Sequence, residues 1–277
     1  MFRAEAFAKT FEYAELFVQG LVCTVSLSAL TVVFGFILAL ALAVMRLSDI
    51  HVFRFLSRKS QRSLTERGGV LYALARFNPL RFLSTVYVEV FRATPMLVQL
   101  FIIYHVVLAG VGIPTFKLFG YIRFERFVPC VVALALNSAA YLCEIIRAGI
   151  QSIDGGQTEA ARSLGMSPWK TMRFVVLPQA IKNILPAIGN EFVTIIKESS
   201  ICYTVGVQDI MYAVTTVKSA IYTIAEPLVV ATCVYFCLTF PTSKIIAHFE
   251  RKMSAGDRRS GADTARTRKR KIHALKG

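Results

Sequence analysis

The chain has 277 residues, of which 55% are hydrophobic and only 18% are charged. A soluble domain carries about 25% charged residues, and the mean hydropathy here is +0.55. This composition excludes an ordinary soluble enzyme and a disordered protein, and it indicates a polytopic membrane protein. Lys and Arg number 32, against 17 Asp and Glu. In a membrane protein such an excess indicates basic cytoplasmic loops rather than binding to nucleic acid.

The first fifteen residues contain three glutamates and no short apolar core with a cleavage site. They therefore predict an external N-terminal segment, residues 1–15, rather than a cleavable signal peptide. Beyond it, a bilayer core of roughly 30 Å needs about 20 apolar residues per helix, and five stretches provide them. They are Leu16–Met45, Ala93–Phe116 with a lead-in over Phe82–Phe91, Phe127–Cys143, Asn183–Gln208 and Ser219–Ser243. The predicted fold is an all-α membrane protein with five transmembrane helices.

The basic residues are concentrated in alternate connecting segments, which lie on one side of these spans. The segments 46–81, 147–182 and 244–277 hold 24 of the 32 Lys and Arg. By the positive-inside rule these segments face the cytoplasm, so the N-terminus is outside and the C-terminus inside. The transmembrane domain then covers 16–249. The tail, 250–277, is basic and weakly apolar, which predicts a disordered segment attracted to anionic lipid headgroups.

A cytoplasmic loop at 152–180 is more structured than a linker. Thr158–Leu164 predicts a short helix with Glu159 near its start, where the helix dipole favours an acid. Gly165 stands where a helix C-cap needs a left-handed residue. Pro168–Leu177 predicts a second helix, capped by Ser167 and ended or kinked by Pro178. The loop should form two short helices that meet at a glycine corner.

This loop resembles the EAA loop of ABC importer permeases. Glu159-Ala160-Ala161, Gly165, Val175, Leu177 and Pro178 match its pattern, with Val175 in place of the usual isoleucine. Further stretches resemble the polar amino-acid branch of that family, the histidine and glutamine type. They are Phe17–Ser28, Tyr87–Gln99, Ala139–Ser152 and Leu177–Ile201.

The resemblance implies a type I importer permease that moves polar amino acids inward across a bacterial inner membrane. It implies as partners a separate ABC ATPase that binds Mg-ATP, a second permease subunit and an extracytoplasmic solute-binding protein. This chain would bind no cofactor or metal. The ATPase would dock on the loop and pass its motion to the spans. The residues so implicated are Glu159, Ala160, Ala161, Leu164, Gly165, Met166 and Ser167.

Charged residues within spans usually face a partner or a watery cavity. Glu89 and Arg92 lie three apart on one helix face, so they either form an internal ion pair or line the solute path. The fourth span offers both charges that a zwitterionic amino acid needs. The path candidates are Glu89, Arg92, Glu191, Lys197, Ser199 and Ser200.

Two other function classes remain open from the residues alone. An ion-gradient-driven secondary transporter would predict internal repeats and would leave the loop unexplained. A non-transporting membrane scaffold would need no ATPase. The sequence has no G-x4-G-K-[ST] phosphate loop, so the chain is not expected to be an enzyme that hydrolyses ATP. The six cysteines have no metal-ligand or redox spacing.

Overall fold

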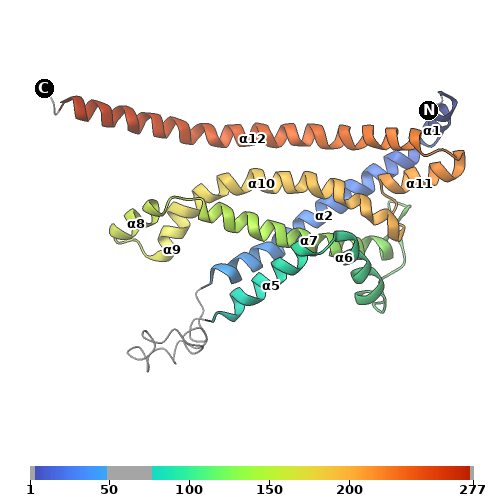
Figure 1. The fold of residues 1–277 in the computed structure, drawn as a ribbon, viewed down its shortest axis with the longest axis horizontal. Coiled ribbons are helices and arrows are strands. Elements are labelled where there is room, and N and C mark those ends of the chain that lie inside the picture. Colours follow the sequence, from blue (N-terminus) through green and yellow to red (C-terminus); the bar gives the residue numbers. More distant parts are fainter. Residues whose placement is uncertain (1–3, 49–76, 275–277) are drawn as a thin grey trace. The chain divides into compact units, whose positions relative to one another are not determined.

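The computed structural model describes the backbone of residues 4–48 and 77–274, with side chains up to Met253 (Figure 1). The basic insert expected at 49–78 lies almost wholly outside these residues. The chain divides into two compact units: Met1–Arg147 with Thr194–Val234, and Ala148–Val193 with Tyr235–Gly277. Each unit is described by itself.

Helices make up nearly all of the described chain, as the composition predicts. The elements are α1 (Ala4–Glu12), α2 (Ala14–Leu47), α5 (Pro79–Ala93), α6 (Met96–Ile102), the π-helical turn η1 (Ile103–Val107), β1 (Lys117–Leu118), β2 (Ile122–Arg123), α7 (Phe124–Gln151), α8 (Gly155–Ser163), α9 (Pro168–Thr171), the π-helical turn η2 (Met172–Val176), α10 (Leu177–Glu198), the 3₁₀ segment η3 (Ser199–Val205), α11 (Ile210–Ile221) and α12 (Ala225–Ala274).

Within the described residues, three helices are long and apolar enough to cross a membrane: α2, α7 and Ala225–Met253 of α12. The pair Pro79–Ala93 and Met96–Val107, bent by 110°, makes a fourth if it is one span. α10 has 22 residues and is the most polar of the expected spans. The all-α membrane fold is confirmed, whereas five spans and an external N-terminus stay predictions.

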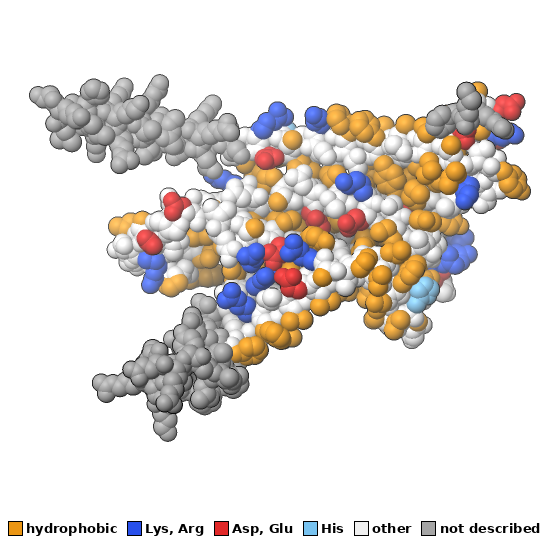
Figure 2. Space-filling view, in the orientation of Figure 1, with side chains coloured by type: hydrophobic (Ala, Val, Ile, Leu, Met, Phe, Trp, Pro, Cys, Tyr) orange, Lys and Arg blue, Asp and Glu red, His pale blue; other side chains and the backbone are white. Residues whose placement is uncertain are grey.

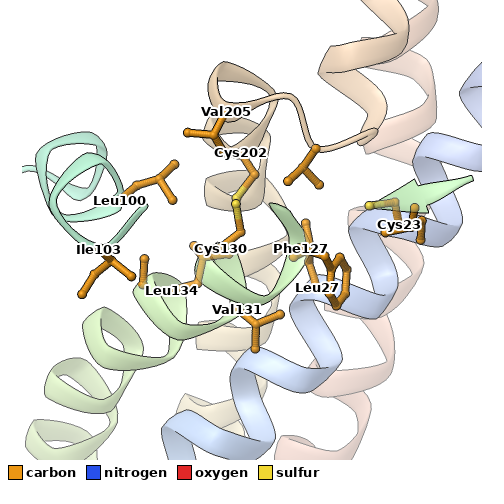
Figure 3. Packing of buried hydrophobic residues seen from close by; sticks show 13 residues of the cluster. Cys23, Leu27, Leu100, Ile103, Phe127, Cys130, Val131, Leu134, Cys202 and Val205 are labelled. Atoms are coloured by element: carbon orange, nitrogen blue, oxygen red, sulfur yellow. The ribbon is translucent and has the colours of Figure 1, made fainter. Parts of the chain in front are cut away.

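The core of the first unit lies where α2, α6, α7 and η3 meet (Figure 3). Small residues on α2 allow this approach: a Cβ added at Gly20 would lie 2.7 Å from the carbonyl oxygen of Asp209, at the start of α11. Cys23, Cys130 and Cys202 are buried here as small apolar side chains. Cys143 is buried elsewhere on α7, and Cys233 and Cys237 on α12 are exposed. The buried cluster includes Cys23, Leu27, Leu100, Ile103, Phe127, Cys130, Val131, Leu134, Cys202 and Val205.

The bend between α5 and α6 is held by buried amides. Thr94 precedes Pro95 and has an extended backbone, because the residue before a proline avoids the helical region. The last carbonyls of α5 then lack helical partners. Nε2 of Gln99 donates to the carbonyls of Phe91 (2.8 Å) and Thr94 (3.0 Å), and Nδ2 of Asn137 donates to Oε1 of Gln99 (2.9 Å). Gln99 therefore caps α5 from inside the fold.

Hydrophobic side chains stay exposed along the outer faces of the long helices, and they cover much of the face in Figure 2. Such surfaces suit contact with lipid. In the second unit, α10 approaches α12 at Gly189, where an added Cβ would lie 2.9 Å from Cγ1 of Ile246. α12 continues as a helix to Ala274, where composition predicts a disordered tail. Its many Ala, Arg and Lys residues favour helix, and no proline follows Pro241.

Candidate coupling site

The predicted loop lies wholly in the second unit, between α7 and α10. Its first helix begins earlier than the sequence suggests. Asp154 caps α8, with Oδ1 accepting from the Gly156 amide at 2.8 Å, so Gly155 and Gly156 open the helix rather than break the preceding span. Glu159 is therefore in the middle of α8 and not in its first turn. An Asx cap outweighs the flexibility of two glycines, because it satisfies amides that would otherwise be unpaired.

The glycine corner is confirmed as a Schellman motif. Gly165 has φ +83°, its amide donates to the Arg162 carbonyl (3.0 Å), and the Met166 amide donates to the Ala161 carbonyl (3.1 Å). This pair of bonds closes α8. A guanidinium nitrogen of Arg162 also donates to the Met166 carbonyl at 2.7 Å. The corner is therefore a rigid turn rather than a flexible loop.

The second helix starts as predicted and, of the two outcomes expected at Pro178, it does not end there. The Ser167 hydroxyl accepts from the Lys170 amide at 3.3 Å and caps α9. The chain then runs through η2 directly into α10. Proline removes an amide donor and crowds the carbonyl four residues earlier, here that of Phe174. The wider turn of η2 accommodates this ring, so α9, η2 and α10 form one uninterrupted path.

The corner exposes apolar side chains. Leu164 is 86% exposed and Trp169 71%, and nothing lies within 4 Å of a Cβ added at Gly165. Ala161 of α8 is buried, and α8 packs against η2. Glu159 is exposed and makes no hydrogen bond or ion pair with the described residues. Of the other predicted residues, Ala160 and Ser167 are exposed and Met166 is half-buried.

The end of α7 is locked to the start of α10 beside this corner. Nδ2 of Asn183 donates to Oγ of Ser152 at 2.9 Å. A Cβ at Gly149 would overlap the Ile184 side chain, whereas Ala148 is exposed. Close packing of α7 on α10 therefore requires a glycine at 149, whereas position 148 accepts a side chain.

Gly149→Val should destabilise the second unit, because the added carbons must displace Ile184. Overpacking of this kind costs about 1–3 kcal/mol, which lowers the thermal midpoint by roughly 2–4 °C per kcal/mol in a chain of this size. Thermal unfolding of a fluorescent fusion, followed by size-exclusion chromatography, measures it. Ala148→Val is the matched control and should unfold like the wild type. An unchanged midpoint for Gly149→Val would contradict the packing described here.

The residues predicted to line the solute path do not form one cluster in the described part of the chain. Glu89 and Arg92 are both exposed and form no ion pair with each other. The Arg92 guanidinium instead lies 5.6 Å from the centre of the Tyr141 ring. Ser199 is buried, with Oγ donating to the Ile196 carbonyl, which does not fit a path-lining role. Lys197 is exposed. The remaining candidates, Glu191 and Ser200, are partly buried.

A three-residue ionic cluster joins α7 to α2. Glu144 accepts from Arg147 at 2.6 Å and from Arg46 of α2, with side chains only 16%, 32% and 15% exposed. Glu144 and Arg147 are three residues apart and signal their own pairing. Arg46 lies 98 residues away from Glu144 in the sequence, and no local pattern could have identified it as the third member.

Comparison with known proteins decides the family. The sequence profile of the family "Binding-protein-dependent transport system inner membrane component" matches residues 67–255. The chain belongs to this family. It is 35% identical over 251 residues to the arginine transport system permease protein ArtQ of Bacillus subtilis, covering 91% of this chain and 98% of that one. A putative glutamine transport system permease protein, GlnP of Rickettsia bellii, is 39% identical over 67% of this chain and 82% of its own length.

A solved structure agrees with these relatives. A crystal structure of an amino acid ABC transporter with histidines superposes with a TM-score of 0.73 and 38% identity, over 91% of this chain and all of that one. This protein is therefore an ABC permease component and not an enzyme, as the sequence predicts. The family match includes the whole of the corner formed by α8 and α9.

Proposed function

We propose that this permease is the membrane subunit of an ATP-driven importer for polar amino acids, located in a bacterial inner membrane. The observation that carries the proposal is the exposed corner at Leu164 and Gly165. A rigid turn that presents an apolar side chain, with open space beside it, is a surface built for a protein partner. The partner is a separate ABC ATPase, because the chain has no phosphate loop of its own.

Force applied at this corner reaches two membrane helices without crossing a flexible joint. α9 continues through η2 into α10, and α8 rests on η2 through Ala161. The Asn183–Ser152 hydrogen bond and the close fit of Gly149 against Ile184 tie in the end of α7. Closing of the ATPase would thus tilt α7 and α10 together. Exposed Glu159 offers a carboxylate for a basic group of the ATPase.

The amino-acid cargo is supported by the relatives, whose names specify arginine and glutamine. Arg92 on α5 and Lys197 at the end of α10 are exposed cations that suit a carboxylate, and Glu89 is an exposed anion that suits an ammonium group. Few charges occur in membrane helices without such a purpose. A second permease subunit completes the path, and an external binding protein delivers the solute. No observation favours an ion-gradient mechanism.

Purification of the tagged chain from native membranes in mild detergent tests the proposal. Mass spectrometry should find a stoichiometric ATPase subunit with the permease. When the complex is reconstituted in proteoliposomes, uptake should require Mg-ATP on the side of the membrane that the α8–α9 corner faces. Solute-loaded binding protein should stimulate ATP hydrolysis by the complex. Screening binding-protein preparations across amino acids then identifies the cargo. A chain that purifies alone and moves amino acids without ATP would overturn the proposal in favour of a secondary transporter.

A further inference from the structure

A small polar pocket lies between η1, the segment that follows η1 and the first turns of α7, all within the first unit. Its volume is about 290 Å³, and most of its wall is polar. Small-molecule sites have volumes of about 300–1,000 Å³, so this pocket has room for one small ligand. Ala109 and Val111 in its wall are exposed, so the pocket opens to the surface.

Irregular helical hydrogen bonding borders the pocket on both sides. In the π-helical turn η1, the Leu108 amide donates to the carbonyl of Ile103 at 2.9 Å, and such turns are frequent at functional sites. Pro129 lies inside α7 and has no amide, so the carbonyl of Glu125, four residues earlier, lacks its α-helical hydrogen bond. Glu125 and Pro129 both line the pocket. The interruption in the hydrogen bonding of α7 therefore lies at the pocket.

The charge in the pocket wall is negative. The Glu125 side chain is half-buried and makes no hydrogen bond or ion pair with the described residues. The adjacent Arg126 is directed elsewhere, with its guanidinium donating to the carbonyl of Gly206 at 3.4 Å. No Lys or Arg of the described chain lines the pocket. A carboxylate that is partly removed from water is stabilised by a cation, so the pocket is complementary to a positive group.

The other wall residues favour an organic cation over a metal ion. Within the described residues, no group of three or more His, Cys, Asp or Glu could hold a metal ion, whereas bound metal ions take roughly four or more ligands. The rings of Tyr104 and His105, which also line the pocket, are 4.8 Å apart in an edge-to-face arrangement. Aromatic rings attract ammonium and guanidinium groups. A carboxylate beside a tyrosine ring therefore suits such a group.

We propose that this pocket binds an ammonium or guanidinium group, with Glu125 as its counter-ion and Tyr104 as its aromatic wall. α7 is long and apolar enough to cross the membrane, and the corner formed by α8 and α9 follows its other end. The pocket thus opens on the side of the membrane opposite the ATPase. The cation is either a free small molecule or a basic side chain of the solute-binding protein. Only the second source rests on the proposed function.

Calorimetric titration of the full-length permease in lipid nanodiscs tests the site. The probe is agmatine, which has a guanidinium and an ammonium group and no carboxylate. It should bind saturably at one site. Glu125→Gln should weaken agmatine binding by about tenfold or more, because it removes a charged hydrogen-bond partner. Glu12→Gln is the charge-matched control at an exposed acid of α1, and it should bind agmatine like the wild type.

A steric variant tests the same pocket without a change of charge. Ala109→Phe places a ring in the pocket from an exposed position, and it should weaken agmatine binding while the protein stays folded. Gly110→Phe is the matched control. It adds a phenyl ring at the next residue, which does not line the pocket and where an added Cβ meets nothing within 4 Å. That variant should keep the wild-type affinity for agmatine.

Affinity for the solute-loaded binding protein, measured in the same nanodiscs, distinguishes the two sources. If the cation belongs to that protein, Glu125→Gln weakens its binding too, and agmatine competes with it. If the cation is a free small molecule, Glu125→Gln affects agmatine alone. Both results support the site. Absence of saturable agmatine binding, or binding that Glu125→Gln and Ala109→Phe leave unchanged, would overturn the proposal, whether or not the chain takes up amino acids with ATP.

Discussion

Gly165→Glu should abolish amino-acid uptake while the chain still inserts in the membrane. The residue has φ +83°, and a side chain in the left-handed region costs roughly 1–2 kcal/mol. The space beside it is open, so the substitution creates no clash inside the permease. Its effects are strain in the Schellman corner and a charge beside Leu164, on the surface proposed for the ATPase. The strain is present in the free and the bound permease alike, so the loss of affinity comes from the charge. An unpaired charge buried in that interface costs about 3 kcal/mol or more, and about 1.4 kcal/mol is a factor of ten in binding, so ATPase affinity should fall by more than about tenfold.

The measurement is radiolabelled uptake in proteoliposomes, with ATPase retention in a pull-down as the second reading. Gly155→Glu is the matched control: it makes the same change in the same loop, also with open space around the residue, but in the first turn of α8, where the helix dipole favours an acid. That variant should transport normally. Normal uptake by well-expressed Gly165→Glu protein would show that this corner does not couple to the ATPase.

Glu144→Ala should destabilise the first unit more than any other removal of a single acid from the described spans. The carboxylate neutralises Arg46 and Arg147 together, and without it two cations remain close to each other and mostly buried. Removing one partner of a buried ion pair costs about 3–5 kcal/mol, and partial exposure here favours the lower value. At roughly 2–4 °C per kcal/mol, the thermal midpoint should fall by several degrees.

Thermal unfolding of a fluorescent fusion, followed by size-exclusion chromatography, measures the shift. Glu89→Ala is the control, because Glu89 is exposed and outside both ion pairs, and its midpoint should stay near that of the wild type. Glu144→Gln should lie between the two, since an amide keeps part of the hydrogen bonding but not the charge. Equal midpoints for Glu144→Ala and Glu89→Ala would mean that the cluster contributes nothing to stability.

Several features of the coupling site could be predicted because they depend on neighbours in the sequence. Gly165, Ser167 and Pro168 are capping signals that act within four or five residues, and the structure places each in the expected role. At Pro178 the sequence left two outcomes open, an end or a kink of the helix. Whether a proline ends a helix depends on how the preceding turn adapts, and the π-helical turn η2 has no signature of its own in the sequence.

The exposed side of the corner also needed the tertiary structure. The sequence indicates that Ala160, Ala161 and Leu164 belong to one short helix, but it does not show which of them faces inward. Packing of α8 on η2 buries Ala161 and leaves Leu164 exposed. For the solute path, the structure shows that Ser199 is buried and that its hydroxyl donates to the Ile196 carbonyl. Glu89 and Arg92 form no ion pair with each other, and the roles of all three residues stay predictions.

The sequence by itself determined the class of protein, from its composition and apolar runs, and the position of the loop proposed for coupling, from its capping residues. The family followed from the resemblance of that loop and of further stretches to known permeases. All of these are local properties of the chain. The tertiary structure decided which distant residues meet: Arg46 with Glu144, and Gln99 with Asn137. Such contacts depend on how helices pack, and helix packing is set by many side chains acting together rather than by any segment alone.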